Sequence, residues 1–170
     1  MDRRKALKNM GMALGYTVAT PTLISLIQSC KTEPAITWAP EFFTMEQGSV
    51  LTKLVDIILP KTDTPSASEV QVDVFIDRFA KEVMQKEQQD FLQMSMSKFM
   101  DKTLEDSGKE KIENLTSEDI EPVLAAALKV SNEDKVTYMD MVNTYNEAIA
   151  EGQPTSLDDG VSRFAFADNL

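Results

Sequence analysis

The sequence of 170 residues contains no histidine and a single cysteine, Cys30. Without histidine there is no imidazole to act as a general base, a metal ligand, a haem ligand or the centre of a serine-histidine-acid triad. One cysteine cannot build a zinc or iron–sulfur site from thiolates, or the paired attachment of a c-type haem. The six glycines form neither a phosphate-binding loop nor a dinucleotide fingerprint. Composition therefore excludes most familiar catalytic centres, and we expect no cofactor in this chain.

The first 30 residues have the order of a bacterial export signal. A basic head with the adjacent Arg3 and Arg4 precedes an uncharged stretch over residues 9–29, and Cys30 follows directly. Paired arginines are typical of the twin-arginine route, which carries folded proteins. The uncharged stretch is long enough to span a membrane, but glycine, proline and hydroxyl residues interrupt it. We interpret residues 1–29 as a signal that is removed, with a retained anchor as the alternative.

Cys30 stands where a lipoprotein signal places its lipidated cysteine. Ser29 fits that pattern, whereas Gln28 is not the small residue usual at its position. An ordinary role as a small hydrophobic residue is the alternative for this thiol. We expect lipidation of Cys30, which would make the mature protein exported, periplasmic and anchored to a membrane.

The chain after residue 30 is strongly acidic. Residues 1–30 hold four basic residues and one acid, so within the total charge of −11 the remainder carries −14. A nucleic-acid groove or an anionic lipid surface needs clustered lysine and arginine, which this part of the chain lacks. We expect no nucleic-acid partner.

The remaining chain divides into a tether over residues 30–43 and one domain over residues 44–170. The tether contains two prolines and no helical period, but Trp38, Phe42 and Phe43 are too apolar for a free linker. Its second half is therefore expected to dock on the domain. The domain shows helical periods and no convincing strand, which predicts an all-α fold of about five helices.

The first helix of this domain is expected to begin at Thr44. Gln47 lies three residues later, in capping-box spacing, and Pro60 ends the helix. The expected buried stripe consists of Val50, Leu51, Leu54, Val55, Ile57 and Ile58.

The longest helical pattern follows the turn at residues 61–68, with a break expected near residues 85–89. On either side of that break its apolar residues recur mostly at steps of three to five, and they are Val70, Val74, Phe75, Phe79, Val83, Phe91, Met94, Phe99 and Leu104.

Two further helices are predicted by their capping residues. One begins at Thr116 or Ser117, and Pro122 predicts an irregular first turn. The other begins at Ser131, with Asp134 three residues later, and ends at Gly152.

Carboxylates are the remaining candidates for catalysis. The pairs Glu118–Asp119 and Asp158–Asp159 have the composition that glycosidic chemistry uses. Both pairs stand in polar stretches or at expected helix starts, where the helix dipole favours acids, and nothing in the sequence indicates burial. We interpret them as solvated caps. No spaced acidic loop with a central glycine exists, so no calcium site is predicted.

A rigid, hydroxyl-rich turn follows the first helix. Two prolines fix its backbone, and Asp63 between them can accept hydrogen bonds from nearby amides or cap the next helix. Its residues are Pro60, Lys61, Thr62, Asp63, Thr64 and Pro65. From the residues alone we interpret it as a structural turn.

These residues carry a resemblance to a known family. The paired-arginine head, the run Asp-Ile-Ile-Leu-Pro-Lys-Thr-Asp-Thr-Pro over residues 56–65 and the Val-x-x-Phe-Ile-Asp helix at residues 72–77 resemble the gluconate 2-dehydrogenase subunit 3 family. The resemblance implies a small exported subunit encoded with a glucose-methanol-choline type flavoprotein dehydrogenase, and sometimes with a c-type cytochrome. It implies FAD in that partner, and a structural or partner-contacting role for the turn at residues 60–65.

Two features depart from the family pattern. Ser66 stands where the family often has glycine. The chain stops at Leu170, without the further aromatic segment of many relatives. Phe164 and Phe166 are therefore expected either to lie on a partner-facing helix or to mark a shortened sequence.

The leading hypothesis is a non-catalytic subunit that binds a flavin-dependent dehydrogenase, supports its twin-arginine export and anchors it at the membrane. The alternative is a free-standing lipoprotein that binds a sugar or peptide in a helical cleft, through Trp38, Tyr138, Tyr145, Asn143 and Asn146. A hydrolase that uses carboxylates alone ranks below both, and it requires two buried acids facing one cleft.

Overall fold

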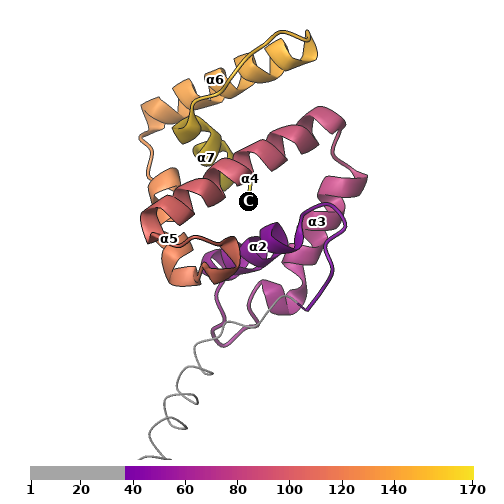
Figure 1. The fold of residues 1–170 in the computed structure, drawn as a ribbon, viewed down its shortest axis with the longest axis vertical. Helices are drawn as coiled ribbons and strands as arrows, with labels where there is room; N and C mark the ends of the chain where they lie inside the picture. Colours follow the sequence, from indigo (N-terminus) through magenta and orange to yellow (C-terminus); the bar gives the residue numbers. More distant parts are fainter. Residues whose placement is uncertain (1–36) are drawn as a thin grey trace, which may run out of the picture. The chain divides into compact units, whose positions relative to one another are not determined.

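The computed structural model describes residues 37–170. The predicted signal at residues 1–29, with Arg3, Arg4 and Cys30, lies outside the described residues. Residues 37–170 fold into six α-helices and two short 3-10 helices, with no strand among them (Figure 1). The all-α prediction is confirmed. The elements are α2 (Met45–Ile58), η1 (Ser68–Val70), α3 (Val72–Glu82), α4 (Lys86–Ser107), η2 (Ile112–Asn114), α5 (Ser117–Leu128), α6 (Asn132–Ala150) and α7 (Asp159–Asp168).

Side-chain caps fix the helix starts that the sequence predicts. The Thr44 hydroxyl accepts a hydrogen bond from the Gln47 amide at 3.1 Å, and the Gln47 side chain accepts one from the Thr44 amide at 3.0 Å. This reciprocal pair satisfies two amides that the first turn of a helix leaves without partners. Ser131 caps α6 through the Asp134 amide, and Gly152 follows that helix with a φ of 70°.

The longest pattern breaks slightly before the position expected. Helix α3 ends at Glu82 and α4 begins at Lys86, so residues 86–89 are already helical. The irregular turn expected at Pro122 is wrong. Helix α5 is regular from Ser117, with Pro122 inside it. The Pro122 ring is exposed, so the helix carbonyl that loses its amide partner there lies on the solvent side.

The core lies where α2, α4, α5 and α7 meet. Its fully buried side chains include Leu51 and Leu54 from α2, Phe99 from α4, Ile120 from α5 and Phe166 from α7. In Figure 1, α7 lies between α4 and α6, and the chain ends in the middle of the picture. Consistent with that position, Leu170 packs against the core.

The expectation of a partner-facing C-terminal helix is wrong. Phe164 and Phe166 are 1% and 2% exposed, and the Phe166 ring packs on Phe99 with centroids 5.3 Å apart. Helix α7 therefore completes the core. It also accounts for the sixth helix, one more than the sequence predicted.

Helices α3 and α6 lie at the edges of this core. Helix α3 packs mainly on α2 and η1, whereas α6 packs on α7 and α4. No residue of α6 is buried. Ile58, expected in the buried stripe of α2, is 43% exposed because that stripe ends with Val55 and the helix ends at Ile58 itself.

The role of α7 can be tested by removing one aromatic ring. We expect Phe166→Ala to lower the free energy of unfolding by about 3–5 kcal/mol, because it removes a fully buried ring from the core. Chemical denaturation measures this change. Phe75→Ala is the matched control, since Phe75 is 66% exposed and its loss should cost less than about 0.5 kcal/mol. Equal stability of the two variants would contradict the core position of α7.

The cap of α5 should make stability depend on pH. Asp119 accepts hydrogen bonds from the Thr116 amide at 2.7 Å and hydroxyl at 2.8 Å, and it pairs with Lys109. Burial raises the pKa of Asp119, but the hydrogen bond from Lys109 and those from Thr116 outweigh it, so the pKa lies below its ordinary value.

A lowered pKa in the folded state means that ionised Asp119 stabilises the fold above the ordinary pKa of 3.8. That contribution disappears as the pH falls through the folded pKa. We expect Asp119→Asn to cost about 1 kcal/mol at neutral pH, and the difference from the parent protein to shrink below a pH of about 4. Urea unfolding at several pH values measures it, and a difference independent of pH would contradict the assignment.

Candidate functional site

The turn at residues 60–65 is exposed along its whole length. Lys61 forms an ion pair with Glu69, and the Thr62 amide donates to the Thr64 carbonyl at 3.1 Å. Asp63, expected to accept hydrogen bonds from nearby amides, accepts none from the residues that the structure describes. The turn therefore presents its polar side chains to solvent, and its contact role stays a prediction.

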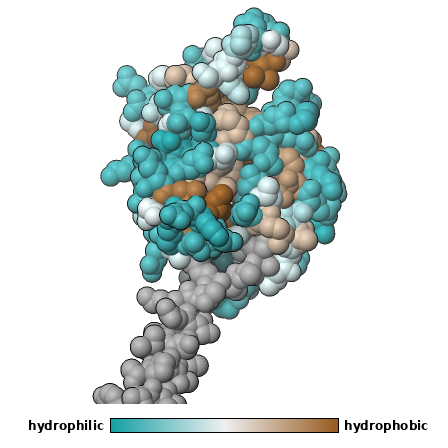
Figure 2. Space-filling model, in the orientation of Figure 1, coloured by the Kyte–Doolittle hydropathy of each residue, from teal (hydrophilic) through white to brown (hydrophobic). Residues whose placement is uncertain are grey.

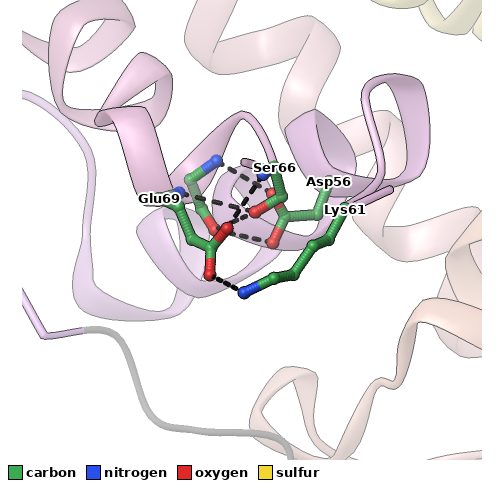
Figure 3. A network of polar contacts seen from close by, with 5 residues as sticks. Asp56, Lys61, Ser66 and Glu69 are labelled. Carbon is green, nitrogen blue, oxygen red and sulfur yellow. Dashed lines mark hydrogen bonds and ion pairs between the residues drawn. The ribbon is translucent and has the colours of Figure 1, made fainter. Parts of the chain in front are cut away.

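Asp56, at the end of α2, takes the role expected of Asp63. Its carboxylate accepts hydrogen bonds from the Ser68 amide at 2.8 Å and the Ser68 hydroxyl at 2.6 Å (Figure 3). Glu69 accepts one from the Ser66 amide at 3.0 Å. The hydrogen bond from Lys61 holds the pKa of Glu69 below its ordinary value. Ser66 is buried within this network, so a side chain stands where the family often has glycine.

Asp77 fastens the end of the tether to α3. Its carboxylate accepts hydrogen bonds from three consecutive backbone amides, those of Glu41 at 2.7 Å, Phe42 at 3.1 Å and Phe43 at 2.9 Å. Asp77 is 1% exposed. Three amide donors satisfy a buried carboxylate that would otherwise be costly to remove from water.

Asp73 makes a second attachment one helical turn earlier. It accepts hydrogen bonds from the Trp38 indole at 2.9 Å and from the Thr52 hydroxyl at 2.6 Å. We call Asp73, Asp77 and the segment at residues 38–43 the clamp. It confirms that the second half of the tether docks on the domain.

The clamp also bears on the hypothesis of a carboxylate hydrolase, which requires two buried acids that face one cleft. Asp73 and Asp77 are the buried acids among residues 37–170, but donors from the chain itself occupy them. They do not form an acid pair facing a cleft. One acid of each pair proposed from the sequence caps a helix, namely Asp119 at α5 and Asp158 at α7. Asp159 instead pairs with Lys98. Among the described residues, no cluster of acids or cysteine is placed to hold a metal ion.

The outer side of α3 carries an uncovered apolar stripe. We call this the α3 stripe; its members and exposed fractions are Val70 (60%), Phe75 (66%), Phe79 (45%) and Val83 (62%). The two phenylalanine rings lie beside each other, with centroids 6.0 Å apart. Together with Arg78 and Glu82 the stripe lines an open depression of about 370 Å³. Sequence periodicity predicted the helix, but not that this side would face solvent.

Helix α6 also carries exposed apolar residues. We call Val136, Met139 and Ile149 the α6 face, whereas Met141 lies on the other side of the helix. An open depression of about 400 Å³ runs beside Val136 and Met139. Lys135, Asp140 and Asn143 complete its lining. In Figure 2 polar residues cover most of the visible face, and brown apolar residues show between them in separate patches, one of them at the end formed by α6.

The residues proposed for a sugar or peptide cleft lie in two places. Trp38 precedes α2, whereas α6 carries the other four, Tyr138, Asn143, Tyr145 and Asn146. Trp38 is bonded to α2 and α3, whereas Tyr138 packs on Phe164 of α7 and Tyr145 on Phe91 of α4. Asn143 lines the depression on α6, apart from the aromatic contacts of both tyrosines.

None of the helices within residues 37–170 has the length and apolar composition of a membrane-spanning segment.

The clamp predicts a large effect of a small substitution. We expect Asp77→Ala to lower the free energy of unfolding by about 3 kcal/mol, because it leaves three amides of residues 41–43 without their acceptor. Limited proteolysis should then cut near residues 38–43, which the parent protein protects. Asp63→Ala is the matched control, as it removes an exposed acid with no hydrogen bond among the described residues. Equal stability of these two variants would contradict the clamp.

Comparison with known protein families finds a match to this chain. The family model described as gluconate 2-dehydrogenase subunit 3 matches residues 45–156, well over half of the chain. The match runs from the start of α2 past the end of α6 and includes the turn and the clamp acids of α3. No curated protein and no solved structure matches the chain. The chain belongs to the gluconate 2-dehydrogenase subunit 3 family.

Proposed function

We propose that this protein is the non-catalytic subunit of a gluconate 2-dehydrogenase-like complex. It binds a glucose-methanol-choline type flavoprotein dehydrogenase, which holds the FAD, and in some complexes a c-type cytochrome joins them. It supports twin-arginine export of that partner through the signal that contains Arg3 and Arg4. Lipidated Cys30 then anchors the complex at the membrane in the periplasm. Family membership supports the accessory role and a dehydrogenase partner.

The observation that carries this proposal is the apolar surface left on two helices at the edges of the core. Four side chains of the α3 stripe and three of the α6 face are each more than a third exposed. Contiguous apolar patches on a soluble domain mark sites of interaction with other proteins. A domain whose edges expose phenylalanine, methionine and valine in this way suits a permanent partner.

The buried acids of the described domain support a binding role rather than a catalytic one. The clamp uses both of them to hold the chain itself. The acids at α5 and α7 cap helices. We therefore assign the dehydrogenase reaction to the partner. This subunit contributes a binding surface and the export signal.

Export in the native bacterium tests the proposal. Deleting this subunit should leave the dehydrogenase encoded beside it in the cytoplasm, because the partner then lacks an export signal. Substituting both signal arginines with lysine (Arg3→Lys, Arg4→Lys) should do the same while the two proteins still co-purify with the yellow absorbance of flavin. Fractionation followed by dehydrogenase assay measures the outcome.

Cys30→Ser is the matched variant for the anchor. It should leave export and binding intact but release the periplasmic complex from the membrane fraction. A dehydrogenase that is exported and active in the absence of this subunit would overturn the carrier role. Membrane retention of a Cys30→Ser complex from which residues 1–29 have been cleaved would overturn the lipid anchor alone.

A further inference from the structure

We propose that the α3 stripe is the surface that the dehydrogenase subunit covers; this inference rests on the proposed function. The occupant would be an apolar protein surface that meets Phe75 and Phe79 and has little net charge around it. The α6 face is the competing candidate, so the choice between the two rests on side-chain type, charge and support.

Side-chain type favours the α3 stripe. Phe75 and Phe79 are four residues apart on one helix and are 66% and 45% exposed, with their rings in contact range. Aromatic residues dominate the binding energy of protein interfaces because they bury a large area with few rotatable bonds. Val70 and Val83 extend the same surface at either end of α3. The α6 face offers valine, isoleucine and methionine only.

Charge identifies the kind of occupant. Basic residues beside the stripe are paired within the domain, because Arg78 and Lys81 both contact Glu41, at 3.7 Å and 2.8 Å, and Lys61 pairs with Glu69. The rim of the stripe is thus close to neutral. At the depression beside the α6 face, Lys135 pairs with Asp168, and Asp140 has no ion pair among the described residues. A neutral rim suits an apolar partner surface without matched charges.

The charge of the whole domain argues against two other occupants. The chain after residue 30 carries −14, so two copies brought together through α3 would repel each other. An anionic lipid surface would be repelled for the same reason. A different protein is the occupant that the electrostatics allow, and the dehydrogenase is the partner of the proposed function.

The hydrogen bonds that hold α3 in place make the α3 stripe a preorganised surface. The clamp holds the inner side of the helix through Asp73 and Asp77, while Phe75 and Phe79 point outward. Gln71, which precedes α3, has a φ of 62°, an uncommon backbone for a residue other than glycine. A surface held in place before binding loses less conformational entropy on association.

The experiment compares two double variants of the full chain, each co-expressed with the dehydrogenase. Phe75→Gln with Phe79→Gln alters the α3 stripe, and Val136→Gln with Met139→Gln alters the α6 face as the matched control. We expect the first to weaken binding of the dehydrogenase at least thirtyfold, about the effect of losing an interface hot spot. We expect the second to leave the affinity within about threefold, as for a surface outside the interface. Thermal unfolding of each variant is the check on folding. Each pair contains one side chain that is mostly exposed, Phe75 or Val136, and one that is 45% or 41% exposed, Phe79 or Met139, so we expect a similar small change in both variants.

The outcomes separate this inference from the proposed function. If the parent chain does not bind the dehydrogenase, both the proposed function and this inference are overturned. If the parent chain binds and the α3 variant binds equally well, only the inference is overturned. Loss of binding in the α6 variant alone would move the interface to α6. A parent chain that dimerises through α3 in sedimentation, or binds anionic vesicles through it, would also overturn the inference.

Discussion

The interaction on which the arrangement of this domain depends is the contact between the Asp77 carboxylate and three backbone amides of residues 41–43. It joins the chain before the first helix of the domain to α3, more than thirty residues later. Phe43 can then enter the core, and Thr44 can begin α2 with its capping box. Helix α3, which otherwise packs mainly on α2 and η1, gains a fixed orientation from the same contact.

Helix α3 consequently has two sides with separate tasks. Its acids at positions 73 and 77 point inward and hold the chain, and its phenylalanines at positions 75 and 79 point outward. Both pairs are four residues apart, so each forms a stripe on the helix surface. A single short helix thus links the stability of the fold to the surface that we assign to the dehydrogenase. In the opposite part of the domain, α7 fills the core that α4 and α5 leave open.

Helix positions were largely predictable, because local chemistry sets them. Thr44, Ser131 and Gly152 are capping residues that act on neighbouring amides and carbonyls, and each stands where the sequence placed it. Burial was less predictable, because an apolar period does not say what covers it. Phe75 and Phe164 look alike in the sequence, yet the first is exposed and the second is buried.

The clamp was missed for a related reason. Nothing local marks Asp77 as the acceptor of amides that lie 34 to 36 residues before it. The one available signal was the four-residue spacing of Asp73 and Asp77 on a face other than that of Phe75 and Phe79. For the turn at residues 60–65, the contact role that the family resemblance implies stays a prediction, and the hydrogen-bonding acid nearby is Asp56 rather than Asp63.

The absence of buried residues in α6 has a consequence for motion. Helix α6 is held by the ring contacts of Tyr138 and Tyr145 and by the Lys135–Asp168 ion pair. Few apolar contacts must break for it to separate, so its opening costs less free energy than global unfolding. Helix α7 lies beneath it and would remain against α4. We therefore expect the amide hydrogens of α6 to exchange sooner than those of the helices that carry buried residues.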